Sequence, residues 1–367
     1  MTIETVGSFL PPEKLIKAGL DFRQGVIDGL QLKSVEDESV AHLVERQLAA
    51  GLHEVTDGEF RRKTWDKDFW FGLGGIRCER VDSGHIYNPV NPFTDIMRFT
   101  DRIAFNPNHP VFDEFSFLQE TVAGRARCRQ TLPSPANLYL EILTMSDGNP
   151  EQIYPDVANM TDDIAKAYNK TFRHLYELGC RHIQIDDTAC GMLIEDNFVK
   201  RQLQGGIDII ALHDVIISLF NNSIADLPSD LVLSLYLSGG DKIVPEWEFL
   251  QFPDNLMPKI LSQVNVDKFY LPFDIGNHYQ FEILRYVPAG KKVALGLADA
   301  HSPFSEDLAM IQNAIDRASK QIPLDNLSVS PKTGFKVSSY AFRGLTYEDQ
   351  WLKISQLQEL NIMKKVL

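Results

Sequence analysis

Carboxylates that follow short apolar runs are the residues of this sequence best suited to chemistry. Asp186 and Asp187 end such a run within residues 183–192, and Glu59 ends another over residues 53–60. A short apolar run is typical of a strand buried on both faces. Acids at the carboxyl end of such a strand lie where an α/β barrel carries its catalytic groups. These carboxylates could bind an ammonium group or act as general acid and base.

Other predicted strands also end in polar residues, which would converge on one site in a barrel. Ser and Asp are equally favoured as caps of the helix that follows a strand, so each candidate has two interpretations. Glu is a poor helix cap, and Asp186 stands one residue before Asp187 in an otherwise apolar strand. These features favour a role in a functional site for Glu59 and Asp186. The full set of strand-end candidates is Ser8, Glu59, Asp186, Asp187, Ser238, Asp274, Asp299 and Lys332.

Histidines and aromatic residues add weaker candidates. His278 and His301 follow the predicted sixth and seventh strands and could reach the same site, although a histidine in a loop is more often only solvated. An aromatic group could stack on a flat heterocycle or could pack a helix against the barrel. It consists of Trp65, Phe69, Trp70 and Phe71.

About eight apolar runs, each followed by a helical pattern, predict a single (β/α)8 TIM-type barrel over residues 1–367. A doubly wound sheet is the alternative, but it would need a glycine-rich first turn, and GSFLPP is not one. The strands are predicted at 4–9, 53–60, 127–138, 183–187, 230–240, 267–274, 291–299 and 325–334. Helices are predicted at 37–50, 160–178, 207–221 and 347–360.

Residues 78–127 interrupt this alternation between the second and third strands. Pro, Asn and Gly alternate there with aromatic residues, as in HIYNPVNPF and AFNPNHPVF. Loops of this length are usually functional or disordered. We therefore expect a long excursion, in the form of a loop or hairpin, that covers the barrel mouth.

Composition limits the possible partners. The net charge of -14 argues against a nucleic-acid-binding surface and against attachment to anionic lipid. The four cysteines have no metal-binding spacing, which favours a reduced, cytoplasmic protein. The sequence begins without a signal-peptide pattern and contains no apolar run of membrane-spanning length. It gives no indication of the oligomeric state.

Seven short motifs together resemble the cobalamin-independent methionine synthases, in particular the short, single-barrel relatives of their catalytic C-terminal domain. Each motif alone is weak, but they follow the family's order and spacing over nearly the whole chain. They are VGSF (6–9), DGEFRR (57–62), TLPSPA (131–136), QIDD (184–187), FNNSIADLP (220–228), GL–D (296–299) and SPKTGF (330–335).

The resemblance implies methyl transfer from 5-methyltetrahydrofolate to homocysteine or a related thiol. The family's homocysteine-binding positions match Gly7, Ser8, Glu59 and Asp186. Two carboxylates would suit the ammonium group of an amino acid, and backbone N–H groups would suit its carboxylate. On the folate side, the residues that could bind a pterin with an acidic tail are Arg61, Arg62, Trp65 and Trp70.

The chain departs from the family at the zinc ligands that activate the thiol. The family's His-x-Cys pair corresponds to Tyr236 and Ser238, its Glu to Pro272 and its last Cys to Thr333. None of these is a good zinc ligand. We therefore expect no zinc and no other cofactor, with Asp186, Glu59 or His301 as the acid or base.

Three functions remain open on the sequence alone. The first is a zinc-independent relative of methionine synthase. The second is a lyase or proton-transfer enzyme acting on a small amino acid, with Asp186 or Glu59 as the acid/base and Tyr236 or Lys332 supporting an anion. The third is a non-catalytic paralogue that binds an amino acid. Fold alone does not choose among them.

Overall fold

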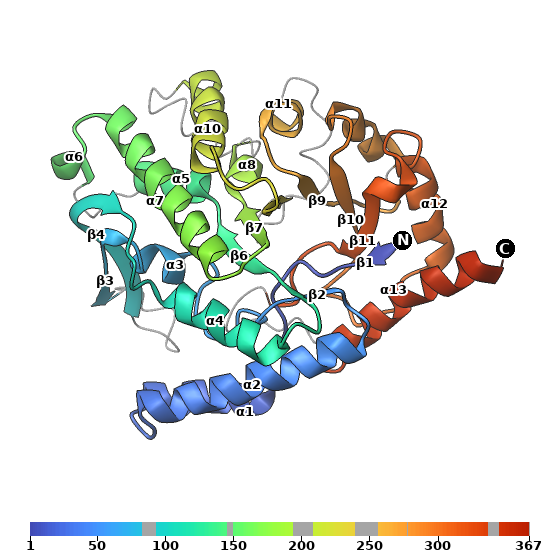
Figure 1. Cartoon of the computed structure of the whole chain (residues 1–367), viewed down its shortest axis with the longest axis horizontal. Helices are drawn as coiled ribbons and strands as arrows, with labels where there is room; N and C mark the ends of the chain where they lie inside the picture. The colour runs from blue at the N-terminus through green and yellow to red at the C-terminus, as the bar shows by residue number, and fades with distance from the viewer. Residues whose placement is uncertain are drawn as a thin grey trace.

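A computed structural model describes residues 1–82, 93–144, 150–193, 208–238, 256–276, 278–336 and 345–366. Within these ranges, short strands alternate with helices along the chain. Figure 1 shows the strands near the middle of the molecule with helices around them, and the long helix α2 running along one side. No helix in the described part of the chain has the length and apolar character needed to cross a bilayer.

The central sheet is parallel throughout. Seven strands follow the order β1-β11-β10-β9-β8-β7-β6, while β5, which precedes β6 by one residue, pairs in parallel with β2. The strand interiors are buried on both faces, which explains their apolar runs. The bounds are β1 (Thr2–Ile3), β2 (Glu54–Val55), β5 (Arg127–Cys128), β6 (Gln130–Pro133), β7 (His182–Asp187), β8 (Val232–Leu237), β9 (Lys268–Pro272), β10 (Lys292–Ala298) and β11 (Leu327–Pro331).

The sheet is open between β1 and β2, a gap that we call the seam. No strand ladder joins these two strands in the described residues. Instead, two hydrogen bonds connect the segments that follow them. Thr56 Oγ1 donates to the carbonyl oxygen of Gly7 at 2.7 Å, and the N–H of Phe9 donates to the carbonyl oxygen of Gly58 at 3.2 Å. The closed eight-stranded barrel expected from the sequence is thus corrected to an α/β fold with a parallel sheet that does not close.

Backbone conformation explains why β1 and β2 are shorter than predicted. The predicted runs 4–9 and 53–60 contain Gly7, Gly58 and Glu59, whose φ angles are 142°, 69° and 59°. Positive φ values interrupt an extended strand. The chain therefore leaves the strand early and forms turns where strand pairing would have closed the seam.

Helices follow most strands, and their starts are set by capping residues. Helix α2 begins at Gly29 rather than near residue 37, because Asp28 and Gln31 form a capping box there. The helices are α1 (Glu13–Arg23), α2 (Gly29–Ala49), α3 (Lys67–Phe71), α4 (Pro110–Val122), α5 (Pro135–Thr144), α6 (Pro150–Ile153), α7 (Val157–Glu177), α8 (Ala189–Met192), α10 (Ile209–Ser223), α11 (Leu256–Gln263), α12 (Leu308–Ala318) and α13 (Asp349–Val366), with 3-10 segments η2 (His278–Tyr286) and η3 (Leu324–Asn326).

The segment predicted as an excursion holds most of an antiparallel strand pair and also a helix that was not predicted. Strands β3 (Gly74–Asp82) and β4 (Phe93–Ala104) pair antiparallel, and α4 follows, started by His109 and by Pro110 in its first turn. Residues 83–92, between the two strands, lie outside the described residues. Coverage of the barrel mouth by this excursion stays a prediction.

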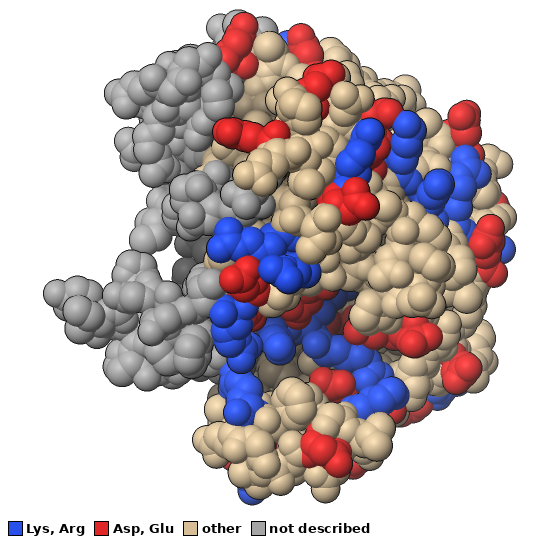
Figure 2. All heavy atoms as spheres, turned by 90° about the vertical axis from the view of Figure 1, so that its left-hand side faces the viewer, with Lys and Arg blue, Asp and Glu red and all other residues tan. Residues whose placement is uncertain are grey.

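The hairpin carries arginines that pair with carboxylates. Figure 2 shows the side of the molecule on which it lies, where Lys and Arg side chains gather beside Asp and Glu side chains. Such mixed charge is typical of a solvated surface. The pairs are Arg77–Glu79 at 3.7 Å, Arg80–Asp95 at 3.1 Å, Arg98–Glu79 at 2.9 Å and Arg102–Asp163 at 2.6 Å.

Candidate active site

Two buried carboxylates lie together at the carboxyl ends of the strands. Glu59 is 6% exposed and accepts from Thr131 Oγ1 at 2.9 Å, while Asp186 is 9% exposed and accepts from Gln184 Nε2 at 2.6 Å. Burial and the negative charge of Glu59 raise the pKa of Asp186 well above its usual range. The two carboxylates therefore repel each other, and a bound cation such as an ammonium group would relieve that repulsion.

The turn that carries Glu59 is held from several directions. Glu59 has a positive φ that non-glycine residues seldom adopt. Its N–H donates to Asp57 Oδ1 at 3.0 Å. The Lys336 ammonium group donates to the carbonyl oxygens of Glu59 at 3.2 Å and of Arg62 at 2.8 Å. A residue held in a rare conformation by its surroundings is typical of a functional site.

Gly7 and Ser8 lie against the loop that follows β11. Ser8 Oγ donates to the carbonyl oxygen of Lys336 at 3.2 Å, and a Cβ on Gly334 would lie 1.9 Å from Ser8 Oγ. A Cβ on Gly7 would lie 3.6 Å from Glu59 Oε1. The structure thus brings Gly7, Ser8 and Glu59 together, with Asp186 close to Glu59.

Asp187 faces the opposite side of β7 from Asp186, because successive side chains of a strand alternate. Its carboxylate accepts from Ser134 Oγ and from the N–H of Cys190, the latter at 2.8 Å. This arrangement fixes the start of α8. Asp187 is therefore a structural carboxylate, the second of the two interpretations that the sequence allowed.

The remaining strand-end candidates make local backbone contacts. Asp274 accepts from the N–H of Gly276 at 3.0 Å, and Asp299 from the N–H of His301 at 2.8 Å. Such contacts stabilise turns. Ser238 and Lys332 each continue the sheet by one backbone hydrogen bond. The N–H of Ser238 donates to the carbonyl oxygen of Asp187 at 2.9 Å, and the N–H of Lys332 donates to that of Ala298 at 2.8 Å.

The four positions that correspond to zinc ligands in the family do not fit a zinc ion. Tyr236 packs in a buried cluster with Val6, Tyr270 and Ala294, and Pro272 has no side-chain donor. Thr333 Oγ1 donates to the carbonyl oxygen of Gly334 and lies 3.2 Å from His301 Nε2. In the part of the chain that the structure describes, no three His, Cys, Asp or Glu side chains form a possible metal site. The side chain of His278 lies outside the described residues.

The two arginines suggested for the folate side point to different neighbours. Arg61 Nη2 lies 2.6 Å from Asp37 Oδ1 on α2. Arg62 is 8% exposed, donates to the carbonyl oxygen of Thr131 at 2.5 Å and lies 3.6 Å from Glu59. Of the two, Arg62 is the one that adjoins the carboxylates.

The aromatic group on the same stretch is mainly packed in the interior. Trp70 is 1% exposed, and its Nε1 donates to Tyr168 OH at 3.2 Å. Phe69 is also buried, with its ring 5.3 Å from that of Tyr168. Trp65 and Phe71 are half-buried. The packing interpretation therefore applies to Phe69 and Trp70, which leaves Trp65 as the tryptophan available to a ligand.

Sequence reasoning missed Thr131, Gln184 and Lys336, which hold the two carboxylates. A signal existed for Gln184, because it stands two residues before Asp186 and so faces the same side of the strand. Thr131 opens the TLPSPA motif, but nothing in its type suggested contact with Glu59. Lys336 acts through a fold contact between distant segments, which no local pattern indicates.

We expect Asp186→Asn to stabilise the ligand-free protein by about 1 kcal/mol near neutral pH. The folded state raises the pKa of Asp186, so it retains a proton that the unfolded chain releases. Stability therefore falls as pH rises from the ordinary aspartate pKa towards the raised one. Urea unfolding at several pH values should show the advantage of the variant growing with pH. An advantage that does not change with pH would contradict this assignment.

A parallel α/β sheet with buried acids at the carboxyl ends of its strands is the arrangement of barrel-type α/β proteins. The B12-independent methionine synthase of Shewanella sp. W3-18-1, solved with selenomethionine, has the same fold. Its TM-score is 0.71 at 19% identity, with 100% of this chain and 98% of that chain covered.

Sequence comparison identifies the family within this class of α/β proteins. Residues 250–342 match the model of the cobalamin-independent synthase catalytic domain. The chain is 31% identical to the uncharacterized protein YxjG of Bacillus subtilis over 97% of its own length and 93% of that protein. It is 21% identical to a methionine synthase of Saccharolobus solfataricus, over 91% of this chain and 88% of that protein. The chain therefore belongs to the cobalamin-independent methionine synthase catalytic domain family.

Proposed function

We propose that the protein is an enzyme that binds homocysteine or a related amino acid at Gly7, Ser8, Glu59 and Asp186. The observation that carries this proposal is the pair of mutually repelling, buried carboxylates, which suits a ligand ammonium group. Backbone N–H groups near Ser8 would receive the ligand's carboxylate. The reaction that family membership supports is methyl transfer to the ligand's sulfur, with methyltetrahydrofolate as donor.

This reaction would proceed here without the family's zinc. An ordinary thiol has a pKa of about 8.5, so most of it is protonated at neutral pH and is a poor methyl acceptor. With Tyr236, Ser238, Pro272 and Thr333 at the ligand positions, a protein base must take the thiol proton. Asp186 is the first candidate, because its raised pKa brings it closer to that of the thiol.

The same observation favours a second candidate, proton transfer on a small amino acid. A carboxyl group whose pKa is raised by burial and by a neighbouring carboxylate can both donate and accept a proton. Asp186 would be the acid/base, and Glu59 would hold the ammonium group. A non-catalytic binder would share the binding site but lack turnover, so assays of both reactions separate the three functions.

Binding of an amino acid is the first test. Calorimetry with homocysteine and methionine should detect binding that strengthens as pH rises through the raised pKa of Asp186, because the ionised form receives the ammonium group. Asp186→Asn should weaken binding about ten-fold or more. Asp187→Asn, on the opposite face of β7, is the matched control and should bind like wild type. Equal affinities for the two variants would refute the site.

The absence of zinc chemistry is tested separately. Protein purified without chelators should contain no stoichiometric zinc by elemental analysis, and methyl transfer to homocysteine should not depend on added zinc. The combined variant Tyr236→His, Ser238→Cys, Pro272→Glu and Thr333→Cys should gain tight zinc binding. Stoichiometric zinc in the wild type would show that these four positions are wrongly matched to the family's ligands.

A further inference from the structure

A cavity lies at the amino-terminal ends of the strands, opposite the candidate active site. It has a volume of about 360 Å³, and the first residues of all the parallel strands except β6 contribute to its lining. Cavities of a few hundred Å³ hold small ligands in other proteins. On β7, His182 lines this cavity while Asp186 serves the candidate active site. The two residues are four positions apart along the strand, or roughly 13 Å.

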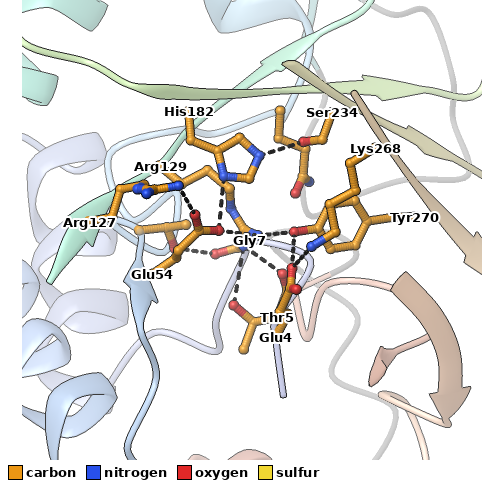
Figure 3. A network of polar contacts seen from close by, with 12 residues as sticks. Glu4, Thr5, Gly7, Glu54, Arg127, Arg129, His182, Ser234, Lys268 and Tyr270 are labelled. Atoms are coloured by element: carbon orange, nitrogen blue, oxygen red, sulfur yellow. Dashed lines mark hydrogen bonds and ion pairs between the residues drawn. The ribbon is translucent and has the colours of Figure 1, made fainter. Parts of the chain in front are cut away.

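Most charged groups of this cavity already have partners, which Figure 3 shows. Lys268 and Tyr270 both donate to Glu4. His182 lies 2.9 Å from Glu54 and 2.8 Å from Ser234 Oγ. Burial lowers the pKa of His182, so its neutral imidazole donates to Glu54 through Nδ1 and accepts from Ser234 at Nε2.

Two buried groups of the lining are unsatisfied. Arg129 is 1% exposed, and its Nη atoms donate to Tyr270 OH and to the carbonyl oxygen of Thr5, each at 2.5 Å, but its Nε has no hydrogen-bond partner within the described ranges. Ser328 is 5% exposed, and its Oγ likewise has no partner there. Buried polar atoms are nearly always paired, so each such atom calls for an explanation.

The lining is locally cationic in an acidic protein. It includes Arg127, Arg129, Lys268 and Lys292 against Glu4, Glu54 and Asp325, whereas the whole chain carries a net charge of -14. The strand register pairs Lys268 with Lys292 and Ser328 with Ala294, which lies two residues from Lys292 on the same face of β10. The unsatisfied hydroxyl and the lysines are thus on the same face of the sheet.

We propose that this cavity binds a small oxyanion, a carboxylate or phosphate group, through Arg129, Ser328 and Lys292. Arg129 Nε, the Ser328 hydroxyl and the Lys292 ammonium group are all donors, and an oxyanion presents several acceptor atoms at once. A guanidinium group fits either oxyanion geometry. The site is separate from the proposed amino-acid site and does not depend on the reaction there.

Calorimetry on the full chain at fixed ionic strength tests this proposal with two probes, inorganic phosphate and malonate. Ser328→Ala removes a hydroxyl that has no partner without ligand, so it should leave the fold intact and weaken binding about ten-fold. Lys292→Gln, at an exposed position, should have a similar effect. Ser330→Ala is the matched control on the same strand, because Ser330 Oγ donates to the carbonyl oxygen of Pro331 and does not line the cavity.

Each outcome decides the matter. Binding of phosphate or of malonate that is weakened in Ser328→Ala or Lys292→Gln, but not in Ser330→Ala, supports the site and identifies the oxyanion class. If neither probe binds at millimolar concentration, or if both lining variants bind like wild type, the proposal is overturned. Homocysteine binding by Ser328→Ala should equal that of wild type, which keeps this test independent of the active site.

Discussion

Replacing Arg129 with methionine is expected to lower the free energy of unfolding by about 3–5 kcal/mol. The Arg129 guanidinium group is buried and joins Thr5, after β1, to Tyr270 on β9. It also lies 4.0 Å from Glu54 on β2. Methionine has similar length but no donors, so it would leave buried acceptors unpaired and would remove one of the buried cations that lower the pKa of Glu54 (Figure 3).

Urea unfolding of the variant measures this loss, and Arg127→Met is the matched control. Arg127 also approaches Glu54, at 3.3 Å, but its side chain is 52% exposed. Exposed ion pairs contribute only about 0–1 kcal/mol. A loss in Arg129→Met no larger than that in Arg127→Met would mean that the buried network does not stabilise the fold.

Gly7→Ala is expected to destabilise the protein by about 2–4 kcal/mol and to abolish amino-acid binding. Gly7 has a φ of 142°, which side-chain-bearing residues rarely adopt, and its new Cβ would lie 2.6 Å from Thr131 Cγ2. Thr131 would have to move, and its hydroxyl is the donor that holds Glu59. Backbone strain at Gly7 and displacement of Thr131 would therefore both disturb the Glu59 carboxylate.

Gly124→Ala separates these two effects. Gly124 also has a positive φ, of 75°, but a Cβ there would have no atom within 4 Å. This control should lose about 1 kcal/mol from backbone strain alone and keep its ligand affinity. Chemical denaturation and calorimetry on both variants give the comparison. If Gly7→Ala lost no more stability and no more affinity than Gly124→Ala, the close approach of Thr131 to Gly7 would contribute neither to stability nor to ligand binding.

The strands could be predicted because burial on both faces leaves a local sequence signal. Residues 182–187 and 292–298 form strands close to their predicted bounds, since every side chain there except that of Lys292 is buried. The seam could not be predicted, because it depends on the φ angles of Gly7, Gly58 and Glu59 rather than on apolar pattern. Helix α4 was hidden by Pro110, which reads as a turn residue but begins a helix.

The site was predicted less completely than the fold. Glu59 and Asp186 were predicted from their position after apolar runs, and in the structure the two carboxylates are close enough to interact electrostatically. Trp70 showed no local difference from Trp65, yet only the structure reveals that it is buried against Tyr168. Lys336 contacts Glu59 although 277 residues separate them in sequence, and the cavity at the amino-terminal ends combines residues from most of the parallel strands. Such long-range contacts leave no trace in local sequence.

The pairing of β1 with β11 has a consequence for synthesis on the ribosome. Thr2 pairs with Ser328 and Ile3 with Val329, so among the described residues β1 has no sheet partner until β11 (Leu327–Pro331) has been synthesised. Until then the apolar side chains of Ile3, Val6 and Phe9, which are buried in the finished protein, have no native surface to cover them. An unpaired apolar segment of this kind is prone to association with other chains. The segment that contains β1 is therefore where a chaperone would have most to protect.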